Sequence, residues 1–264
     1  MFSGKRGGSD AYVPLMRLME ADKDIELNIL LGDMHASDKF GGTVRDVKSA
    51  LPETALHLIR MGAGRGDTPE IRAENLGTCM REAGKVLARI RPDIVMVHGD
   101  RGEHLAVALA GLTMNMAVTH SQGGDVSGNI DEIQRHAITK LAHIHFPETK
   151  EAAQRIKRMG EEAWRIHAVG SLYIDRIAKK MYTPTEHAKK KYGIAQGDQY
   201  AIALLHPETF CSREENYATA KNMFAVLKKS AIPAIVIHPC SDPGYGGVMR
   251  TIDEIRGDPR FMIY

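Results

Sequence analysis

The alternation of two hydrophobic periods constrains this chain more than any other feature of its sequence. Short apolar runs rich in β-branched residues are separated by longer stretches in which apolar residues recur with a helical period. This alternation is typical of βα units that build a parallel sheet covered by helices. The strands it predicts are 26–31, 93–98, 116–120, 143–146, 165–169, 200–205 and 234–238. The helices it predicts are 11–21, 69–90, 103–114, 132–141, 150–159, 214–229 and 247–255.

A polar, lysine-rich stretch at 179–199 separates two such halves. It contains Pro184 and carries no strand signal before Tyr200, so we expect the chain to cross between domains there. This predicts a Rossmann-like N-terminal domain at 1–180 and a partial Rossmann-like C-terminal domain at 181–264.

The two ends of the chain lead to a further expectation. A glycine-rich loop at 4–8 should follow a strand, and residues 1–3 are too short to supply one. The last residues, 261–264, read as a strand, which would leave an apolar sheet edge unpaired. We therefore expect the second domain to be incomplete and further residues to follow Tyr264 in the whole protein.

Composition and charge exclude several classes of protein. The 264 residues are 43% hydrophobic, enough for a sizeable core, and 35 Lys+Arg against 33 Asp+Glu form no basic block. We therefore expect no nucleic-acid partner, and no apolar run approaches the ~20 residues of a membrane span. Three cysteines without paired spacing are typical of a reducing compartment, so we expect a cytoplasmic protein. The 12 histidines show no HExxH or paired Cys/His spacing, so no metal or other cofactor is expected.

Polar side chains gather directly after the predicted strands. In open α/β sheets ligands bind at the carboxyl ends of the strands, so these residues are the candidates for a site. They are Asp100 and Arg101, the loop Gly123-Gly124-Asp125, His206, and Cys240 with Asp242. Each alone has a plain structural explanation, such as a turn residue, a helix cap or a satisfied histidine. Their common location indicates a shared site.

A further cluster at 131–136 opens the helix predicted at 132–141. Asp131 and Arg135 are four residues apart and therefore share one helix face. Taken alone, they are better explained by an acid that the helix dipole favours and an ion pair on a solvated surface. Considered with the strand ends, they add an acid and an arginine to the same predicted site.

These segments occur in one long, ordered signature. It resembles that of the hydrolysing UDP-N-acetylglucosamine 2-epimerases, of the type that supplies sialic acid and nonulosonate precursors. The segments that carry the resemblance are 99–103 (GDRGE), 123–128 (GGDVSG), 130–132 (IDE) and 135–143 (RHAITKLAH). Segments 4–6, 32–35, 170–175 and 206–207 extend it over nearly the whole chain.

The resemblance implies a glycosyltransferase-B-like α/β fold of two domains and a UDP-sugar substrate. The implied reaction eliminates UDP to give a glycal, and water addition then gives N-acetylmannosamine. The residues that match catalytic groups are Asp100, Asp125, Asp131 and His206. The residues that match substrate contacts are Arg6, Arg101, Gly124, Arg135, His136 and Asp175. The resemblance also implies a homo-oligomer assembled through the N-terminal domain.

Departures from the family pattern leave alternatives open. Asp125 stands where the family usually has Glu, and a displacement of a reacting group by about 1 Å can cost ~100-fold in rate. One alternative is a 2-epimerase for UDP-N,N'-diacetylbacillosamine. The others are a glycosyltransferase of the same fold and an inactive or truncated homologue.

Overall fold

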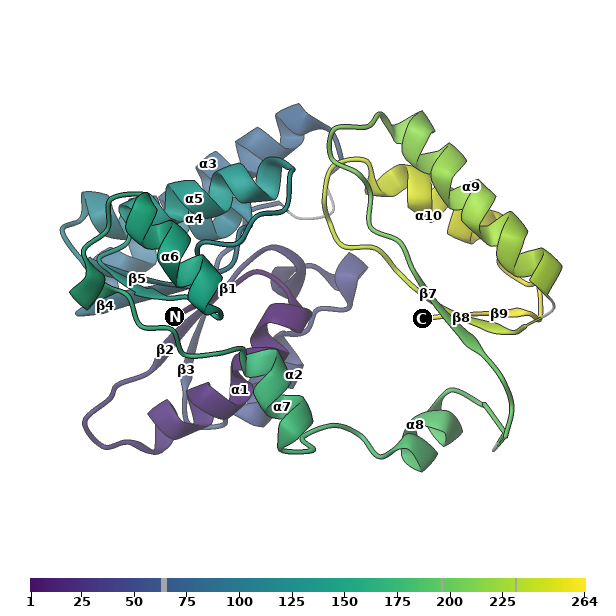
Figure 1. The fold of residues 1–264 in the computed structure, drawn as a ribbon, viewed down its shortest axis with the longest axis horizontal. Coiled ribbons are helices and arrows are strands. Elements are labelled where there is room, and N and C mark those ends of the chain that lie inside the picture. Colours follow the sequence, from purple (N-terminus) through teal and green to yellow (C-terminus); the bar gives the residue numbers. More distant parts are fainter. Residues whose placement is uncertain (63–65, 196, 231) are drawn as a thin grey trace. The chain divides into compact units, whose positions relative to one another are not determined.

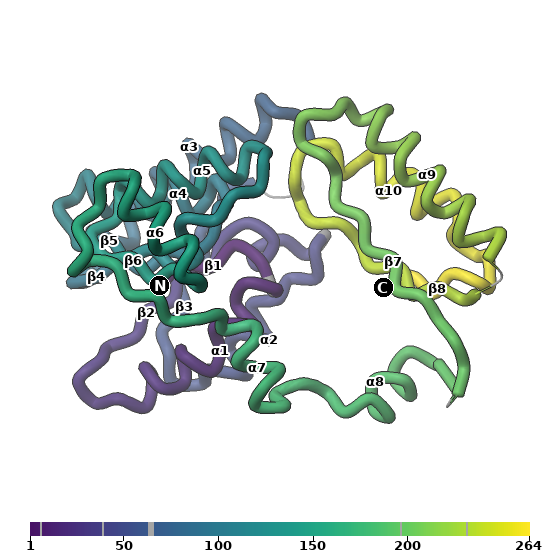
Figure 2. The backbone as a smooth tube through the Cα atoms, viewed as in Figure 1, coloured from purple at the N-terminus to yellow at the C-terminus, as the bar shows by residue number. Residues whose placement is uncertain are grey.

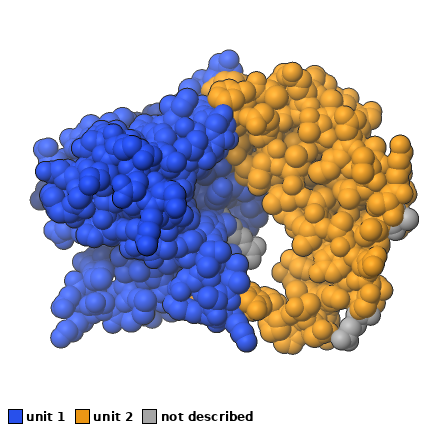
Figure 3. Space-filling view, in the orientation of Figure 1, with its two compact units in different colours: residues 1–66, 70–180 blue, residues 67–69, 181–264 orange. Residues whose placement is uncertain are grey.

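The computed structural model describes residues 1–62, 66–195, 197–230 and 232–264, apart from the side chains of Arg6 and Lys39. Within these residues the chain divides into two compact units, coloured blue and orange in Figure 3. Unit 1 comprises Met1–Gly66 and Glu70–Lys180. Unit 2 comprises Asp67–Pro69 and Met181–Tyr264, so a short segment from early in the chain belongs with its last third.

Parallel strands form the centre of unit 1. Its described strands make two three-stranded sheets, one in the order β1-β2-β3 and the other in the order β4-β5-β6. Strand β1 lies against β4, so the spatial order 3-2-1-4-5-6 is that of a Rossmann fold. The bounds are β1 Phe2–Ser3, β2 Asn28–Leu31, β3 Ala55–Leu58, β4 Ile94–His98, β5 Ala117–Ser121 and β6 Ile144–Phe146.

Helices cover both faces of these sheets because successive side chains of a strand point to opposite sides. In β2, Leu30 joins a core built with α3 and α4, whereas Ile29 and Leu31 join a second core built with α1 and α2. Figure 1 shows the two groups of helices on either side of the strands. The helices are α1 Arg6–Ala21, α2 Val44–Ala50, α3 Pro69–Ile90, α4 Gly102–Thr113, α5 Ile130–Leu141, α6 Lys150–Arg158 and α7 Leu172–Ala178. Short 3-10 helices are η1 Asp33–Ala36, η2 Asp38–Phe40 and η3 Ala163–Arg165.

Unit 2 repeats the βα pattern on a smaller scale. Its described strands β7 Ala201–Leu204, β8 Ala234–Ile237 and β9 Phe261–Ile263 form one parallel sheet. Helices α9 Arg213–Ser230 and α10 Tyr245–Glu254 pack beside each other on it, and α8 Thr185–Lys191 precedes β7, as the tube in Figure 2 traces. The Phe224 ring on α9 meets the Phe261 ring on β9 edge to face, with 5.7 Å between centroids.

The predicted fold class is confirmed: the structure is α/β with parallel sheets. The helix predicted at 69–90 has those bounds as α3. The strand predicted at 165–169 is wrong, because only Ile166 forms an isolated bridge, to His145, and η3 occupies Ala163–Arg165. Beside the edge strand β6 the N–H groups of His167 and Val169 donate to the carbonyls of His145 and Pro147, but this pairing is too short to form a strand and Val169 is solvent-exposed.

The predicted glycine-rich loop at 4–8 is also wrong in extent. Helix α1 begins at Arg6, so Gly7 and Gly8 are helical and the connection from β1 is only Gly4-Lys5. Gly8 is needed for close packing, since a Cβ there would lie 2.6 Å from Nε2 of His98. Residues 2–3, expected to be too short for a strand, pair with β2. Among the helices of the described residues, none has the length and apolar character to cross a bilayer.

Candidate active site

Two loops of unit 1 lie at the carboxyl ends of β4 and β5. Gly99 ends β4 with a positive φ of 70°, and its N–H donates to the Ser121 carbonyl at the end of β5 over 2.9 Å. Asp100 follows it, with 27% of its side chain exposed, and α4 begins two residues later. The β4 loop is thus tied to the neighbouring strand by its backbone while the Asp100 carboxylate remains partly accessible.

Arg135 of α5 connects the Asp100 loop to the Asp125 loop. Its guanidinium forms an ion pair with the Asp100 carboxylate, and only 10% of the side chain is exposed. Nη1 also donates to the backbone oxygen of Asp125 over 3.1 Å and to Oγ of Ser127 over 3.4 Å. Arg135 is therefore buried between two candidate loops and does not sit on a solvated helix surface.

The start of α5 places Asp131 one helical turn before Arg135. Asn129 caps this helix, since its side-chain oxygen accepts from the backbone N–H of Asp131 over 3.1 Å. This cap fixes where α5 begins, and the half-buried Asp131 shares a helix face with Arg135. Asp100, the Asp125 loop and the α5 start, which the sequence placed in one site, thus come together in unit 1.

The glycines before Asp125 leave no space for side chains. A Cβ on Gly124 would lie 2.5 Å from the Ala152 carbonyl oxygen, and its φ is +86°. A Cβ on Gly123 would lie 2.9 Å from both Nδ1 of His120 and Oγ1 of Thr139. The Gly124 carbonyl accepts a hydrogen bond from Arg155 of α6. Gly124 is thus where this loop packs on α6, and its predicted substrate contact stays a prediction.

A neutral histidine on β5 connects the β4 loop to α5. His120 is fully buried; its Nε2 donates to the Gly99 carbonyl over 2.8 Å, and its Nδ1 lies 3.2 Å from Oγ1 of Thr139. The donation fixes the tautomer because a carbonyl oxygen only accepts. Burial lowers the pKa of His120 to about 3, so the ring is uncharged near neutral pH.

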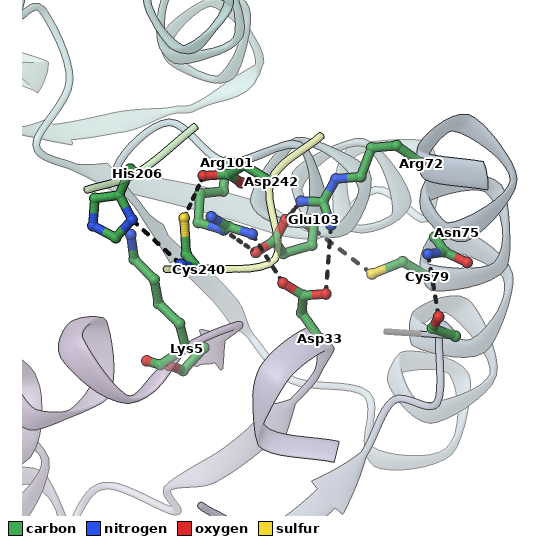
Figure 4. A network of polar contacts seen from close by, with 12 residues as sticks. Lys5, Asp33, Arg72, Asn75, Cys79, Arg101, Glu103, His206, Cys240 and Asp242 are labelled. Atoms are coloured by element: carbon green, nitrogen blue, oxygen red, sulfur yellow. Dashed lines mark hydrogen bonds and ion pairs between the residues drawn. The ribbon is translucent and has the colours of Figure 1, made fainter. Parts of the chain in front are cut away.

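Arg101 faces protein carboxylates. Its Nε donates to Oε1 of Glu103 over 2.5 Å, and its Nη2 donates to Oδ2 of Asp33 over 2.9 Å. Figure 4 shows the charged groups of Asp33, Arg72, Arg101 and Glu103 pointing toward one another. The ligand contact that the resemblance implied for Arg101 stays a prediction.

The remaining predicted residues lie in varied surroundings. His136 on α5 is half-buried, and its Nε2 is a buried atom with no hydrogen-bond partner among the described residues. Asp175 on α7 is exposed and pairs with Nζ of Lys179 over 2.6 Å. His206 belongs to unit 2, where its Nδ1 accepts from the Cys240 N–H over 3.3 Å. The Arg6 side chain lies outside the described part of the structure.

Sequence reasoning missed two residues beside Asp100. Gln122 has a positive φ of 62°, and its Nε2 donates to Oε1 of Glu148 over 2.8 Å. Tyr173 on α7 is 39% exposed, and its pKa is raised, first because part of its side chain is withdrawn from water and then because the carboxylates of Glu148 and Asp100 are near. Tyr173 falls in the 170–175 segment of the signature, which was the one available hint; the backbone strain at Gln122 has no sequence signal.

Comparison with known proteins places these features in context. The model of the UDP-N-acetylglucosamine 2-epimerase family matches residues 17–264. A UDP-N-acetylglucosamine 2-epimerase of Neisseria meningitidis is 30% identical over 97% of this chain and 66% of its own length. A hydrolysing UDP-N,N'-diacetylbacillosamine 2-epimerase of Legionella pneumophila is 28% identical over 97% of this chain and 67% of its own. This chain therefore spans about two thirds of the length of these relatives.

Solved structures share the fold. A UDP-GlcNAc 2-epimerase of Methanocaldococcus jannaschii, in complex with UDP-GlcNAc and UDP, has a TM-score of 0.77 at 20% identity, covering 100% of this chain and 72% of that one. A UDP-GlcNAc 2-epimerase of Neisseria meningitidis bound to UDP-GlcNAc has a TM-score of 0.75 at 17% identity, covering 99% and 70%. At these identities the likeness concerns the fold alone.

Proposed function

The chain belongs to the UDP-N-acetylglucosamine 2-epimerase family, and we propose that it takes part in hydrolysing 2-epimerisation of UDP-N-acetylglucosamine. The reaction breaks the C1–O bond to UDP with loss of the C2 proton, which gives a glycal. Water then adds across the double bond to give N-acetylmannosamine. The observation that carries this proposal is the convergence of Asp100, the Asp125 loop and the α5 start around Arg135.

The chemistry accounts for several carboxylates near one sugar ring. The C2 hydrogen of a glycoside is weakly acidic, so its removal needs a base in hydrogen-bond reach while donors stabilise the departing diphosphate. Water addition then needs a proton delivered to the other face of C2 and a base for the water. We assign the acid and base roles to Asp100, Asp125 and Asp131.

The other roles follow from the resemblance and are proposed with it. His206 and Arg6 would engage the sugar and the diphosphate, and His136 and Asp175 would contact substrate. Arg135 holds the two acid-bearing loops and would present its remaining surface to the ligand. We assign residues 1–180 to the N-terminal domain and 181–264 to part of the nucleotide-binding domain, in a cytoplasmic homo-oligomer.

The Legionella pneumophila relative supports a second candidate substrate. That protein is named for UDP-N,N'-diacetylbacillosamine and matches 97% of this chain. The second candidate is therefore the same reaction on that sugar nucleotide. It uses the same carboxylates, so the two candidates differ in the sugar that is accepted and agree on the chemistry.

Incubation with each UDP-sugar in D2O, without an acceptor, tests the proposal. We expect release of UDP and a free 2-epimeric amino sugar with deuterium at C2, observed by 31P and 1H NMR. Retention of the nucleotide on an epimerised sugar would instead identify a non-hydrolysing enzyme. Absence of UDP release with both sugars, although UDP binds, would contradict the proposal and favour an inactive homologue. UDP release only with an added acceptor would indicate a glycosyltransferase.

Asp100→Asn is the matched variant for this assay. It keeps the shape of the side chain and removes the charge that pairs with Arg135. If Asp100 transfers a proton, deuterium incorporation at C2 should fall by about 100-fold or more. Wild-type incorporation in Asp100→Asn would remove Asp100 from the proposed role.

A further inference from the structure

Four buried charged side chains lie behind the Asp100 loop, and we name them the charge cluster: Asp33, Arg72, Arg101 and Glu103. Arg101 bonds Glu103 over 2.5 Å and Asp33 over 2.9 Å. Arg72 bonds the other oxygen of each carboxylate, over 2.5 Å to Glu103 and 3.4 Å to Asp33. The side chains of Asp33 and Glu103 are 0% exposed, that of Arg101 is 7% exposed and that of Arg72 is 16% exposed. The two guanidinium groups balance the two carboxylates.

The charge cluster joins segments that are distant in sequence. Asp33 begins η1 after β2, Arg72 lies on α3, and Arg101 and Glu103 flank the start of α4. The turn between β1 and α1 also packs here, since a Cβ on Gly4 would lie 2.4 Å from Oε1 of Glu103. Asp33 has a φ of +44°, a backbone conformation that a non-glycine residue keeps only when its surroundings hold it.

From this placement we infer that Arg101 and Glu103, with Asp33 and Arg72, are positioning residues that fix the Asp100 carboxylate for proton transfer. The inference rests on the proposed function. Arg101 is the residue next to Asp100 and the N-cap of α4, so holding its guanidinium at two carboxylates fixes the backbone that carries Asp100. On its other side, Asp100 meets Arg135.

The small net stability of buried ion pairs indicates that the charge cluster serves to orient side chains and not only to fill the core. Buried ion pairs are commonly no more stabilising than well-packed apolar residues of the same volume. Stability alone is therefore a poor explanation for a cluster of four charges. The charge-assisted hydrogen bonds between a guanidinium and a carboxylate are directional, so they fix the orientation of the side chains that they join. Burial opposes ionisation of Glu103, but the Arg101 and Arg72 charges outweigh it and hold its pKa below the ordinary value.

Glu103→Gln tests the inference, with Glu161→Gln as the matched control. Glu161 is also a buried carboxylate with two partners, Lys140 and His145, and lies outside the proposed machinery. We expect Glu103→Gln to lower kcat by about 100-fold with KM within about 3-fold, because misplacement of a reacting group acts on the transition state. Glu161→Gln should lower thermal stability comparably and leave kcat unchanged. Equal kcat in the two variants would overturn the inference.

A second variant covers the case in which Glu103→Gln does not fold. Arg72→Lys keeps the charge at the most exposed corner of the charge cluster and removes the fork that holds both carboxylates. A fall in kcat with KM unchanged upholds the inference. Wild-type kcat in folded Arg72→Lys overturns it.

If the wild-type protein shows no turnover, the proposed function is refuted. The positioning role is then tested by structure. Crystal structures of the two glutamine variants then decide. Loss of the Asp100–Arg135 ion pair in Glu103→Gln, with the pair intact in Glu161→Gln, upholds the positioning role. An intact pair in both variants overturns it.

Discussion

Unit 1 contains two arginines that hold carboxylates in different surroundings. Arg101 is enclosed in the charge cluster, where it binds two fully buried carboxylates. Arg135 pairs with Asp100, whose side chain is 27% exposed, and otherwise bonds a backbone oxygen and a hydroxyl. The enclosed arrangement around Arg101 is suited to fixing the backbone that surrounds it. The open one leaves a carboxylate within reach of a ligand, so the two centres should respond differently to substitution.

Removal of the enclosed guanidinium should have the largest effect on stability. Arg101→Met leaves Asp33 and Glu103 with Arg72 as their remaining partner in the charge cluster, so we expect the free energy of unfolding to fall by about 3–5 kcal/mol. Chemical denaturation measures this. Arg81→Met, which removes an exposed pair with Glu82 on α3, is the control and should cost less than about 1 kcal/mol. A similar small cost for Arg101→Met would contradict the buried assignment.

Removal of the more open guanidinium should cost less stability and more function. Arg135→Gln leaves Asp100 able to take solvent in place of the ion pair, so we expect a loss of about 1–3 kcal/mol. Turnover should fall by about 100-fold, because the loops bearing Asp100 and Asp125 lose their common partner. Denaturation and UDP release measure the two effects. If Arg135→Gln lowers the free energy of unfolding as much as Arg101→Met does, the expected difference between the two arginine sites is wrong.

Buried neutral histidines in the same region should make stability depend on pH. Burial lowers the pKa of His98 to about 4 and that of His120 to about 3, against about 6.5 when unfolded. The unfolded chain therefore binds more protons, so stability is complete above pH 6.5 and falls as pH decreases toward the folded values. Each histidine contributes up to about 1.4 kcal/mol per pH unit in that window. Unfolding free energies at pH 7.5, 6 and 5 measure the slope, which His120→Gln should flatten; an unchanged slope would refute this origin.

The exposed ion pair between Asp175 and Lys179 should give the smallest effect on stability. Asp175 is 44% exposed and its partner Lys179 is 61% exposed, so Asp175→Asn should change the free energy of unfolding by less than about 1 kcal/mol. The effect should shrink further in high salt. Parallel measurement of kcat/KM tests the proposed sugar contact. A fall in kcat/KM at unchanged stability supports the contact, and an unchanged value removes it.

The periodicity of apolar residues predicted the main helices and strands of this fold, but it missed short elements whose hydrophobic pattern is weak. The helix at 69–90 has a long amphipathic pattern and a proline start, and its predicted bounds agree with α3. Strand β3, Ala55–Leu58, and helix α2, Val44–Ala50, were missed, because each is short and half of β3 faces solvent. Gly7 and Gly8 read as loop, because the reason for glycine at position 8 of α1 is its close packing on His98, which only the structure reveals.

The candidate site was predictable in part for a similar reason. Strand ends located Asp100 and the Asp125 loop, and helical spacing located Asp131 with Arg135. The charge cluster was not predictable, because Arg101 and Asp33 are 68 residues apart in sequence. A single sequence shows which residues are charged but not which of them meet in the interior, so the two carboxylate partners of Arg101 were not predicted.

The packing of Gly123 and Gly124 bears on how substrate preference can change in this scaffold. Any side chain at either position would meet His120, Thr139 or the α6 backbone, so neither position can be used to reshape the proposed site. The next three residues, 126–128, are solvent-exposed and follow the half-buried Asp125. A library that seeks acceptance of a bulkier or deoxygenated sugar should therefore diversify 125–128 and leave the glycine pair fixed. Evolutionary drift in specificity is expected to have used the same few positions.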